Sequence, residues 1–120
     1  MPDIQLPQSG PPIPVRYVIL HHIGVEPEHY DLMVHLPGHE KLVTWRILTP
    51  PETWVQSAPT AERIGDHRLA YLEHEGEISG GRGRVSRLAS GAAQLGTQEG
   101  THCRLFFELG LTLSLPASGS

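Results

Sequence analysis

Three histidines and one aspartate lie within eleven positions near the start of the chain, at His21, His22, His29 and Asp31. Imidazole nitrogens and a carboxylate are a ligand set that divalent transition metals bind. Two imidazoles and one carboxylate also leave coordination positions open, so that a bound ion can act as a Lewis acid. The spacing therefore favours a metal site, with a polar strand face that carries unrelated histidines as the alternative.

The segment from His29 to Leu36 alternates between apolar and more polar residues. This period of two predicts a strand, and residues i and i+2 of a strand point the same way, about 6.6 Å apart. His29 and Asp31 can therefore reach one ion, with Tyr30 on the opposite face. The preceding run from Arg16 to His22 is β-branched and aromatic, which predicts a neighbouring strand that ends at the histidine pair.

The rest of the chain also predicts short strands, separated by glycine and proline. They are expected over residues 42–48, from residue 77, over 84–89, and over 103–109 and 111–115. Residues 49–63 carry three prolines and predict a surface loop, with a short strand near Trp54 and Val55. Asp66 is expected to cap a brief helical turn over residues 67–72. Together, these elements predict an all-β fold. The expected architecture is a small closed or nearly closed antiparallel β-barrel of about seven or eight strands with at most one short helix.

A length of 120 residues predicts one domain. We expect a flexible proline-rich arm over residues 1–14, the barrel over 15–116 and a flexible tail over 117–120. Nine basic residues against thirteen acidic ones give a net charge of −4. This balance argues against a broad nucleic-acid surface, but it allows recognition of a single phosphate or strand end.

The single cysteine, Cys103, excludes an internal disulfide and suits a reducing cytoplasm, where we expect the protein to reside. No apolar run approaches the roughly 20 residues of a membrane span, so no membrane partner is expected. The first fourteen residues lack the pattern of a secretory signal peptide.

Five motifs in order resemble the 3′-phosphoesterase domain of bacterial DNA ligase D, a factor of nonhomologous end joining. The resemblance spans about residues 16–91, roughly two-thirds of the chain. The shared motifs are the strand ending at His21-His22, His29-Tyr30-Asp31-Leu32, a Trp45 strand running into Pro50-Pro51, Asp66-His67…Tyr71, and Glu75-Gly76-Glu77-Ile78.

This resemblance implies a DNA-repair hydrolase that trims 3′ ends, removing a terminal phosphate or ribonucleotide with a divalent metal, Mn²⁺ being favoured. Carried over by position, His22, His29 and Asp31 are the metal ligands. His67 is the catalytic contact to the scissile phosphate, and Tyr71 supports it. The implied partners are nucleic-acid 3′ ends, either DNA or DNA–RNA primer termini, together with other end-joining proteins.

Two basic positions of that family differ here. Met33 stands where the family has an arginine two residues beyond the metal-binding aspartate, and Thr49 stands where it has a lysine. Charged contacts to phosphate are among the stronger hydrogen bonds, so other residues must supply them. The candidates are Arg46 on the tryptophan strand, and Arg82 and Arg84, which flank the glycines.

Three functions remain open from the sequence. The first is a metal-dependent 3′-end phosphoesterase, and the second is a non-catalytic module of the same fold that binds a metal and a phosphorylated end. The third is a cupin-like oxygenase with an iron site of two histidines and one carboxylate. For His67, the alternative to catalysis is that it merely follows a helix-capping Asp66.

Overall fold

Eight strands form one antiparallel sheet in the computed structural model, which describes residues 4–119. Two short 3₁₀ helices, η1 (Pro51–Thr53) and η2 (Leu69–Leu72), lie in the connections. The strands are β1 (Ile13–Ile23), β2 (His29–His35), β3 (Lys41–Ile47), β4 (Ala61–Arg68), β5 (Gly76–Glu77), β6 (Arg84–Leu95), β7 (His102–Phe107) and β8 (Thr112–Pro116). The prediction of an all-β fold is therefore confirmed.

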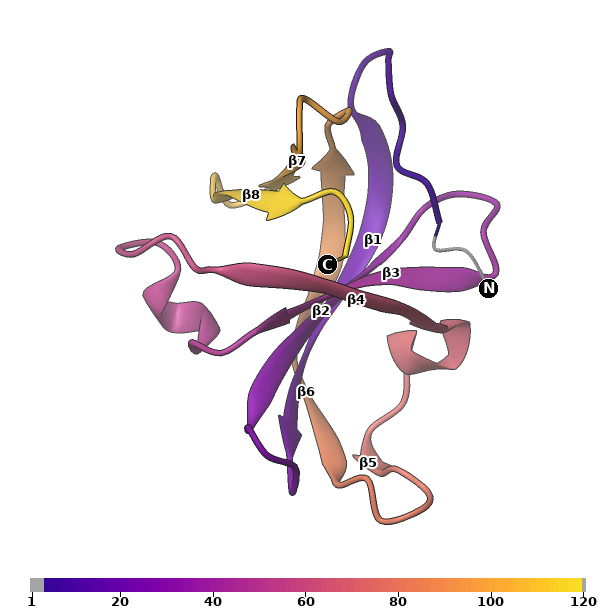
Figure 1. Ribbon diagram of the computed structural model, residues 1–120, viewed down its shortest axis with the longest axis vertical. Coiled ribbons are helices and arrows are strands. Elements are labelled where there is room, and N and C mark those ends of the chain that lie inside the picture. The colour runs from indigo at the N-terminus through magenta and orange to yellow at the C-terminus, as the bar shows by residue number, and fades with distance from the viewer. Residues whose placement is uncertain (1–3, 120) are drawn as a thin grey trace.

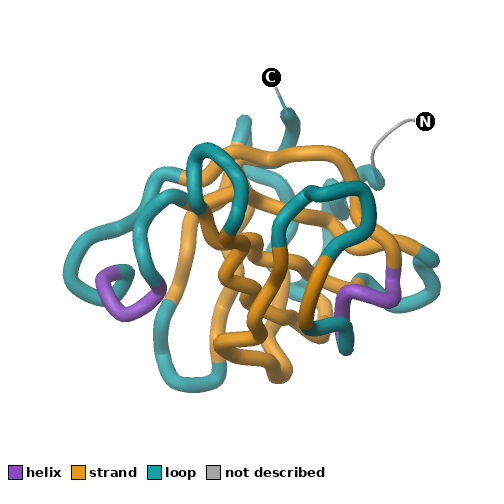
Figure 2. The backbone as a smooth tube through the Cα atoms, turned by 90° about the horizontal axis from the view of Figure 1, so that it is seen from below, coloured by secondary structure: helices purple, strands orange, loops and turns teal. Residues whose placement is uncertain are grey.

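The sheet runs in the order β4-β3-β2-β1-β6-β7-β8, with β5 paired to β6. It curls into a half-barrel in which β3 and β4 cross the long strands β1 and β6 (Figures 1 and 2). Side chains of β3 and β4 bridge the seam to the end of β8. The Nη1 atom of Arg63 donates to the carbonyl of Ala117 at 2.6 Å, and Nε1 of Trp45 donates to the carbonyl of Pro116 at 2.8 Å.

Apolar clusters lie on both faces of the sheet, so β2 is buried on both sides. Leu32 and Val34 belong to the larger cluster with Trp45. Met33 belongs to the smaller one, which also contains Leu20. The face of β2 expected to be polar is therefore buried as well, because the smaller cluster and the adjoining segments cover it.

The segment before Tyr71 differs from the prediction of a loop followed by a capped helix. Residues 61–68 form β4, and the helical turn begins only at Leu69. Asp66 caps no helix, since its carboxylate accepts hydrogen bonds from the backbone N–H of Ile4 and from Arg63. The predicted strand near Trp54 and Val55 is also wrong, because Trp54 caps the end of η1.

Part of the segment over residues 4–14, where a flexible arm is expected, packs against the domain, whereas residues 8–12 are exposed. Leu6 is 2% exposed, and Arg63 donates to the carbonyl of Ile4 at 2.6 Å. Ala117, expected in a flexible tail, is buried and donates its N–H to the carbonyl of Thr101. Residues 1–3 of the expected arm and Ser120 of the expected tail lie outside the described residues. Among residues 4–119, no helix has the length and apolar character needed to cross a bilayer.

Candidate metal centre

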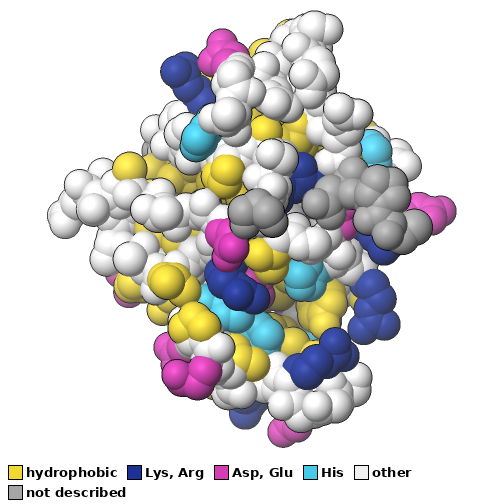
Figure 3. All heavy atoms as spheres, viewed as in Figure 1, with side chains coloured by type: hydrophobic (Ala, Val, Ile, Leu, Met, Phe, Trp, Pro, Cys, Tyr) yellow, Lys and Arg dark blue, Asp and Glu magenta, His cyan; other side chains and the backbone are white. Residues whose placement is uncertain are grey.

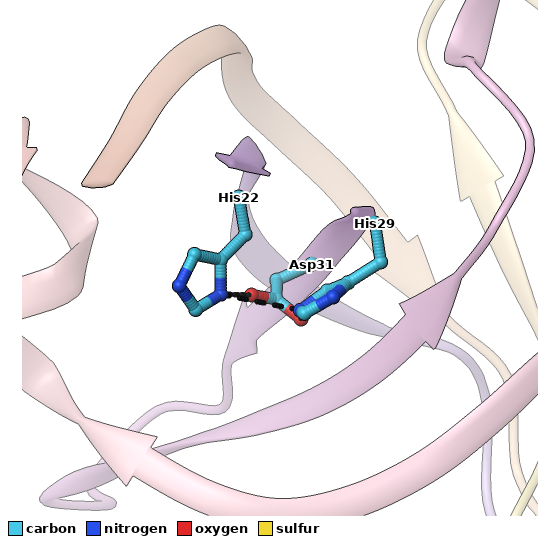
Figure 4. Close-up of side chains that lie close together, drawn as sticks. All are labelled: His22, His29 and Asp31. Atoms are coloured by element: carbon cyan, nitrogen blue, oxygen red, sulfur yellow. Dashed lines mark hydrogen bonds and ion pairs between the residues drawn. The ribbon is translucent and has the colours of Figure 1, made fainter. Parts of the chain in front are cut away.

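The register of β1 and β2 brings His22, His29 and Asp31 together. His22 lies directly opposite His29, and Leu20 lies opposite Asp31. Paired residues of an antiparallel ladder share a face, and so do residues i and i+2 of one strand. The three side chains therefore project from the same face and converge (Figure 4).

The donor atoms of the three side chains are close to one another. Nδ1 of His22 lies 3.2 Å from Nε2 of His29. The Asp31 carboxylate presents Oδ2 to His22 at 3.5 Å and Oδ1 to His29 at 3.3 Å. Ligands on adjacent positions of one ion, with bonds of about 2.1 Å, lie roughly 3.0–3.4 Å apart. The observed separations match that spacing closely.

Backbone carbonyls hold the outer nitrogens of both rings. Nε2 of His22 lies 2.8 Å from the carbonyl oxygen of Arg82, and Nδ1 of His29 lies 2.9 Å from that of Pro27. A carbonyl oxygen only accepts, so each of these nitrogens carries the hydrogen. In the neutral rings, Nδ1 of His22 and Nε2 of His29 are therefore unprotonated and face each other. Such backbone contacts are the usual way in which a metal-binding histidine is oriented.

Burial makes this convergence of acceptors costly without a cation. His29 and Asp31 are 4% and 2% exposed. Oδ1 of Asp31 is buried and has no hydrogen-bond partner. Two imidazole lone pairs and a buried carboxylate oxygen need a positive charge among them, supplied by a proton or a metal ion. The residues present therefore fit a divalent cation.

The adjacent His21 points to the opposite face of the sheet. Its ring stacks on Tyr30 at 4.6 Å, and its Nε2 lies 2.8 Å from a carboxylate oxygen of Glu28. Burial raises the pKa of Tyr30, and the carboxylates of Glu28 and Glu52 act in the same direction. The structure thus brings His22, rather than His21, to the cluster.

A surface hollow of about 360 Å³ opens beside His22 and Asp31. Its wall includes three of the residues expected to act on a substrate, His67, Tyr71 and Arg82. Histidines and basic side chains gather around a depression on this face of the molecule (Figure 3). The structure therefore places these three residues next to the candidate metal ligands.

His67 and Tyr71 are in contact, with ring centroids 5.6 Å apart in an edge-to-face arrangement. Nδ1 of His67 lies 2.8 Å from the carbonyl of Gly65, so this nitrogen carries the hydrogen. The free nitrogen of the neutral ring is Nε2, which accepts a proton or, once protonated, donates to an oxyanion.

The three candidate phosphate-binding arginines differ in position. Arg82 lines the hollow beside the candidate metal ligands. Arg46 lies opposite Asp31 in the ladder of β2 and β3, and its Nε is buried without a partner, but it lines a neighbouring hollow of about 680 Å³. Arg84 is exposed and lines neither of these two hollows.

Sequence reasoning missed the groups that orient the two imidazoles. The carbonyls of Pro27 and Arg82 act through the backbone, so no side-chain type signals them. Arg68, at the end of β4, also lines the hollow. The residues at the divergent basic positions have different surroundings. Met33 lies in the wall of the hollow beside the ligands, and Thr49 lines the hollow that contains Arg46.

No protein-family model and no curated protein matches this chain. The chemistry assigned to the centre therefore depends on its geometry.

Proposed function

We propose that this protein is a metal-dependent phosphoesterase that removes a 3′-phosphate or a 3′-ribonucleotide during end processing in DNA repair. One observation carries the proposal. The facing ring nitrogens of His22 and His29 converge with the Asp31 carboxylate beside a hollow lined by His67 and Arg82. The motifs shared with the phosphoesterase domain of DNA ligase D support it.

Ester hydrolysis at phosphorus needs charge stabilisation on the phosphate and an activated water. A divalent ion held by the three side chains would supply Lewis-acid stabilisation of a phosphate oxygen and lower the pKa of a bound water. The carboxylate of Asp31 shifts the preference toward a harder ion such as Mn²⁺, compared with the softer ions that an all-sulfur site prefers. The carbonyl contacts of His22 and His29 orient the two rings that would hold the ion.

The side chains of the hollow have separate roles in this proposal. Protonated His67 donates a hydrogen bond to the phosphate or gives its proton to the leaving oxygen. Tyr71 is a positioning residue, because its ring packs against that of His67. Arg82 lines the same hollow, and its positive charge would assist phosphate binding.

The partners in this proposal are nucleic-acid 3′ ends, of DNA or of DNA–RNA primers, together with other end-joining proteins. The net charge of −4 suits binding of a strand end in a local pocket rather than along an extended basic surface. We place the protein in the cytoplasm, where its single buried cysteine stays a free thiol.

An end-labelled primer assay tests the proposal. Primer-templates that end in a 3′-phosphate or a 3′-ribonucleotide are incubated with the protein and several divalent ions, Mn²⁺ among them. Product is expected with Mn²⁺ and is expected to disappear in Asp31→Ala. The matched control is His35→Ala, on the same strand but outside the cluster, which retains turnover. Absence of product from both substrates at saturating Mn²⁺ would contradict the proposal.

Met33 favours a second candidate, a non-catalytic module that binds a metal and a phosphorylated end. Met33 is 1% exposed in the wall of the hollow, where its thioether offers phosphate no charge. This candidate predicts one bound ion per chain and measurable binding of a 3′-phosphorylated end without product. Multiple turnover in the primer assay would exclude it.

A further inference from the structure

The turn after β1 and the loop before β6 touch at two glycines. We call residues 79–83 the glycine loop. Gly83 has a φ of +83°, and a Cβ there would overlap the carbonyl oxygen of Ile23. A Cβ on Gly24 would lie 3.0 Å from Cα of Gly83. This backbone-to-backbone contact requires the absence of a side chain at Gly83.

The close contact determines where the carbonyl of Arg82 lies. This carbonyl directly precedes Gly83 and accepts the hydrogen bond from Nε2 of His22 at 2.8 Å. The N–H of Ile78 donates to the carbonyl of Gly83 at 2.8 Å and closes the base of the loop. Any side chain at Gly83 would push the loop away from β1 and draw the Arg82 carbonyl off the ring.

We infer that Gly83 is a positioning residue for the metal centre and that order in the glycine loop is linked to ion binding at His22. The inference rests on the metal-binding part of the proposed function. The Arg82 carbonyl keeps the hydrogen of His22 on Nε2, which leaves Nδ1 free for the ion. By reciprocity, an ion that selects this form of His22 strengthens the carbonyl contact and stabilises the loop.

The same loop also presents a side chain to the hollow. Nε of Arg82 donates to the carbonyl of Ser79 at 2.8 Å, and Arg82 is one of the residues that line the hollow beside the candidate ligands. Order in the glycine loop therefore determines both the tautomer of His22 and the position of Arg82, whose positive charge is available to a phosphate. Ion binding thus prepares the phosphate site before a substrate arrives.

Two glycine substitutions in the same loop test the positioning role. Gly81 has a φ of +69°, and a Cβ there would meet nothing within 4 Å. Gly81→Ala therefore introduces a similar backbone strain without the overlap, which makes it the matched control for Gly83→Ala. Calorimetric titration with Zn²⁺ is expected to show a loss of affinity of about 10–100-fold in Gly83→Ala and little change in Gly81→Ala. Equal affinities in the two variants would overturn the inference.

Nitrogen NMR of the histidine rings gives a readout that general destabilisation would not change. In metal-free wild-type protein and in Gly81→Ala, His22 is expected to carry its hydrogen on Nε2. In folded Gly83→Ala, the signal is expected to become that of a tautomer mixture. An unchanged Nε2–H signal in folded Gly83→Ala would overturn the positioning role.

Hydrogen exchange on the wild-type chain tests the linkage even where Gly83→Ala fails to fold. Zn²⁺ is expected to slow exchange at residues 79–84, with no change at the 97–101 turn and no effect in Asp31→Ala. Bound Zn²⁺ with unchanged exchange at 79–84 would overturn the linkage and leave the phosphoesterase proposal standing. Slowed exchange without turnover in the primer assay would support the linkage and contradict the phosphoesterase proposal.

Discussion

Nδ1 of His22 and Nε2 of His29 face each other at 3.2 Å, while a backbone carbonyl accepts from the other nitrogen of each ring. In the neutral rings, neither facing nitrogen carries a hydrogen. The Asp31 carboxylate completes a pocket of acceptors in a buried setting. This convergence of acceptor atoms is unfavourable without a cation and favourable with one, so cation binding should stabilise the fold.

A divalent ion is expected to raise the free energy of unfolding. At a free ion concentration 100 times the dissociation constant, the gain is about 2.7 kcal/mol. Thermal unfolding with Mn²⁺, Zn²⁺ or a chelator measures the shift in the midpoint, which should vanish in Asp31→Asn. His35→Gln, whose wild-type imidazole lies 2.9 Å from the carbonyl of His39, should keep the shift. An equal shift in Asp31→Asn would place the ion elsewhere.

Loss of His67 is expected to lower turnover without lowering metal affinity. His67 lines the hollow but is not among the three converging ligands. Removing one hydrogen-bond donor to a transition state typically lowers kcat by roughly 10²–10³-fold. Primer assays on His67→Ala measure this loss, and calorimetry checks that the ion still binds.

The control for that experiment is His74→Ala. Its imidazole also packs against Tyr71, with centroids 5.7 Å apart, but it lies outside the hollow beside the ligands. This substitution should leave kcat nearly unchanged. Equal losses in the two variants would point to Tyr71 packing rather than to chemistry at His67.

Arg63→Ala is expected to destabilise the fold by about 3–5 kcal/mol. The buried guanidinium donates to the carbonyls of Ala117 and Ile4 and pairs with Asp66 at 3.2 Å. Its removal leaves a nearly buried carboxylate with no positive charge and opens the seam beside β4. Urea unfolding measures the loss, and Glu62→Ala, at the exposed neighbouring position, serves as the control. A loss below about 1 kcal/mol would contradict this account of the seam.

Cys103 is expected to resist alkylation while the protein is folded. Burial raises the pKa of its thiol from 9.0 to about 11, although nearby Arg63 acts slightly in the other direction. Iodoacetamide at pH 8 should therefore modify the thiol in urea but not in buffer, as mass spectrometry would show. Rapid modification in buffer would contradict the burial of this residue.

The same pKa difference predicts a pH dependence of stability. The thiol keeps its proton to a higher pH in the folded chain, so the folded state binds more protons between pH 9 and pH 11. Stability should therefore fall as pH rises through this range, by on the order of 2 kcal/mol from this group. Unfolding curves of wild type and Cys103→Ala isolate the contribution, since the variant lacks it. Parallel curves would show that Cys103 does not contribute.

The strands of the site were predictable from the sequence because their signals are local. Alternation around Asp31 and the β-branched run before His22 gave strands whose register places the ligands together. The sequence did not separate His21 from His22 by pattern alone. In the structure, the pairing of His22 with His29 separates them, since the adjacent His21 pairs with Tyr30 on the other face.

The errors arose where distant contacts outweigh local preference. Gly65 and Asp66 are poor strand formers, yet they lie in β4, where a register shift opposite Leu42 and Thr44 accommodates them. Asp66 satisfies its carboxylate with Arg63 and the N–H of Ile4, sixty-two residues away, instead of capping a helix. The same contact joins the start of the proline-rich segment to β4.

The pairing of His22 with His29 also bears on how β1 and β2 stay aligned. A slip of one residue between the strands would turn the donors of one strand away from those of the other. A cation bound by residues of both strands would therefore oppose such a slip and stabilise the register of β1 and β2. In that case, removing the ion would loosen the β1–β2 hairpin, which carries all three ligands. A chelator would then disorder these two strands before the rest of the fold unfolds.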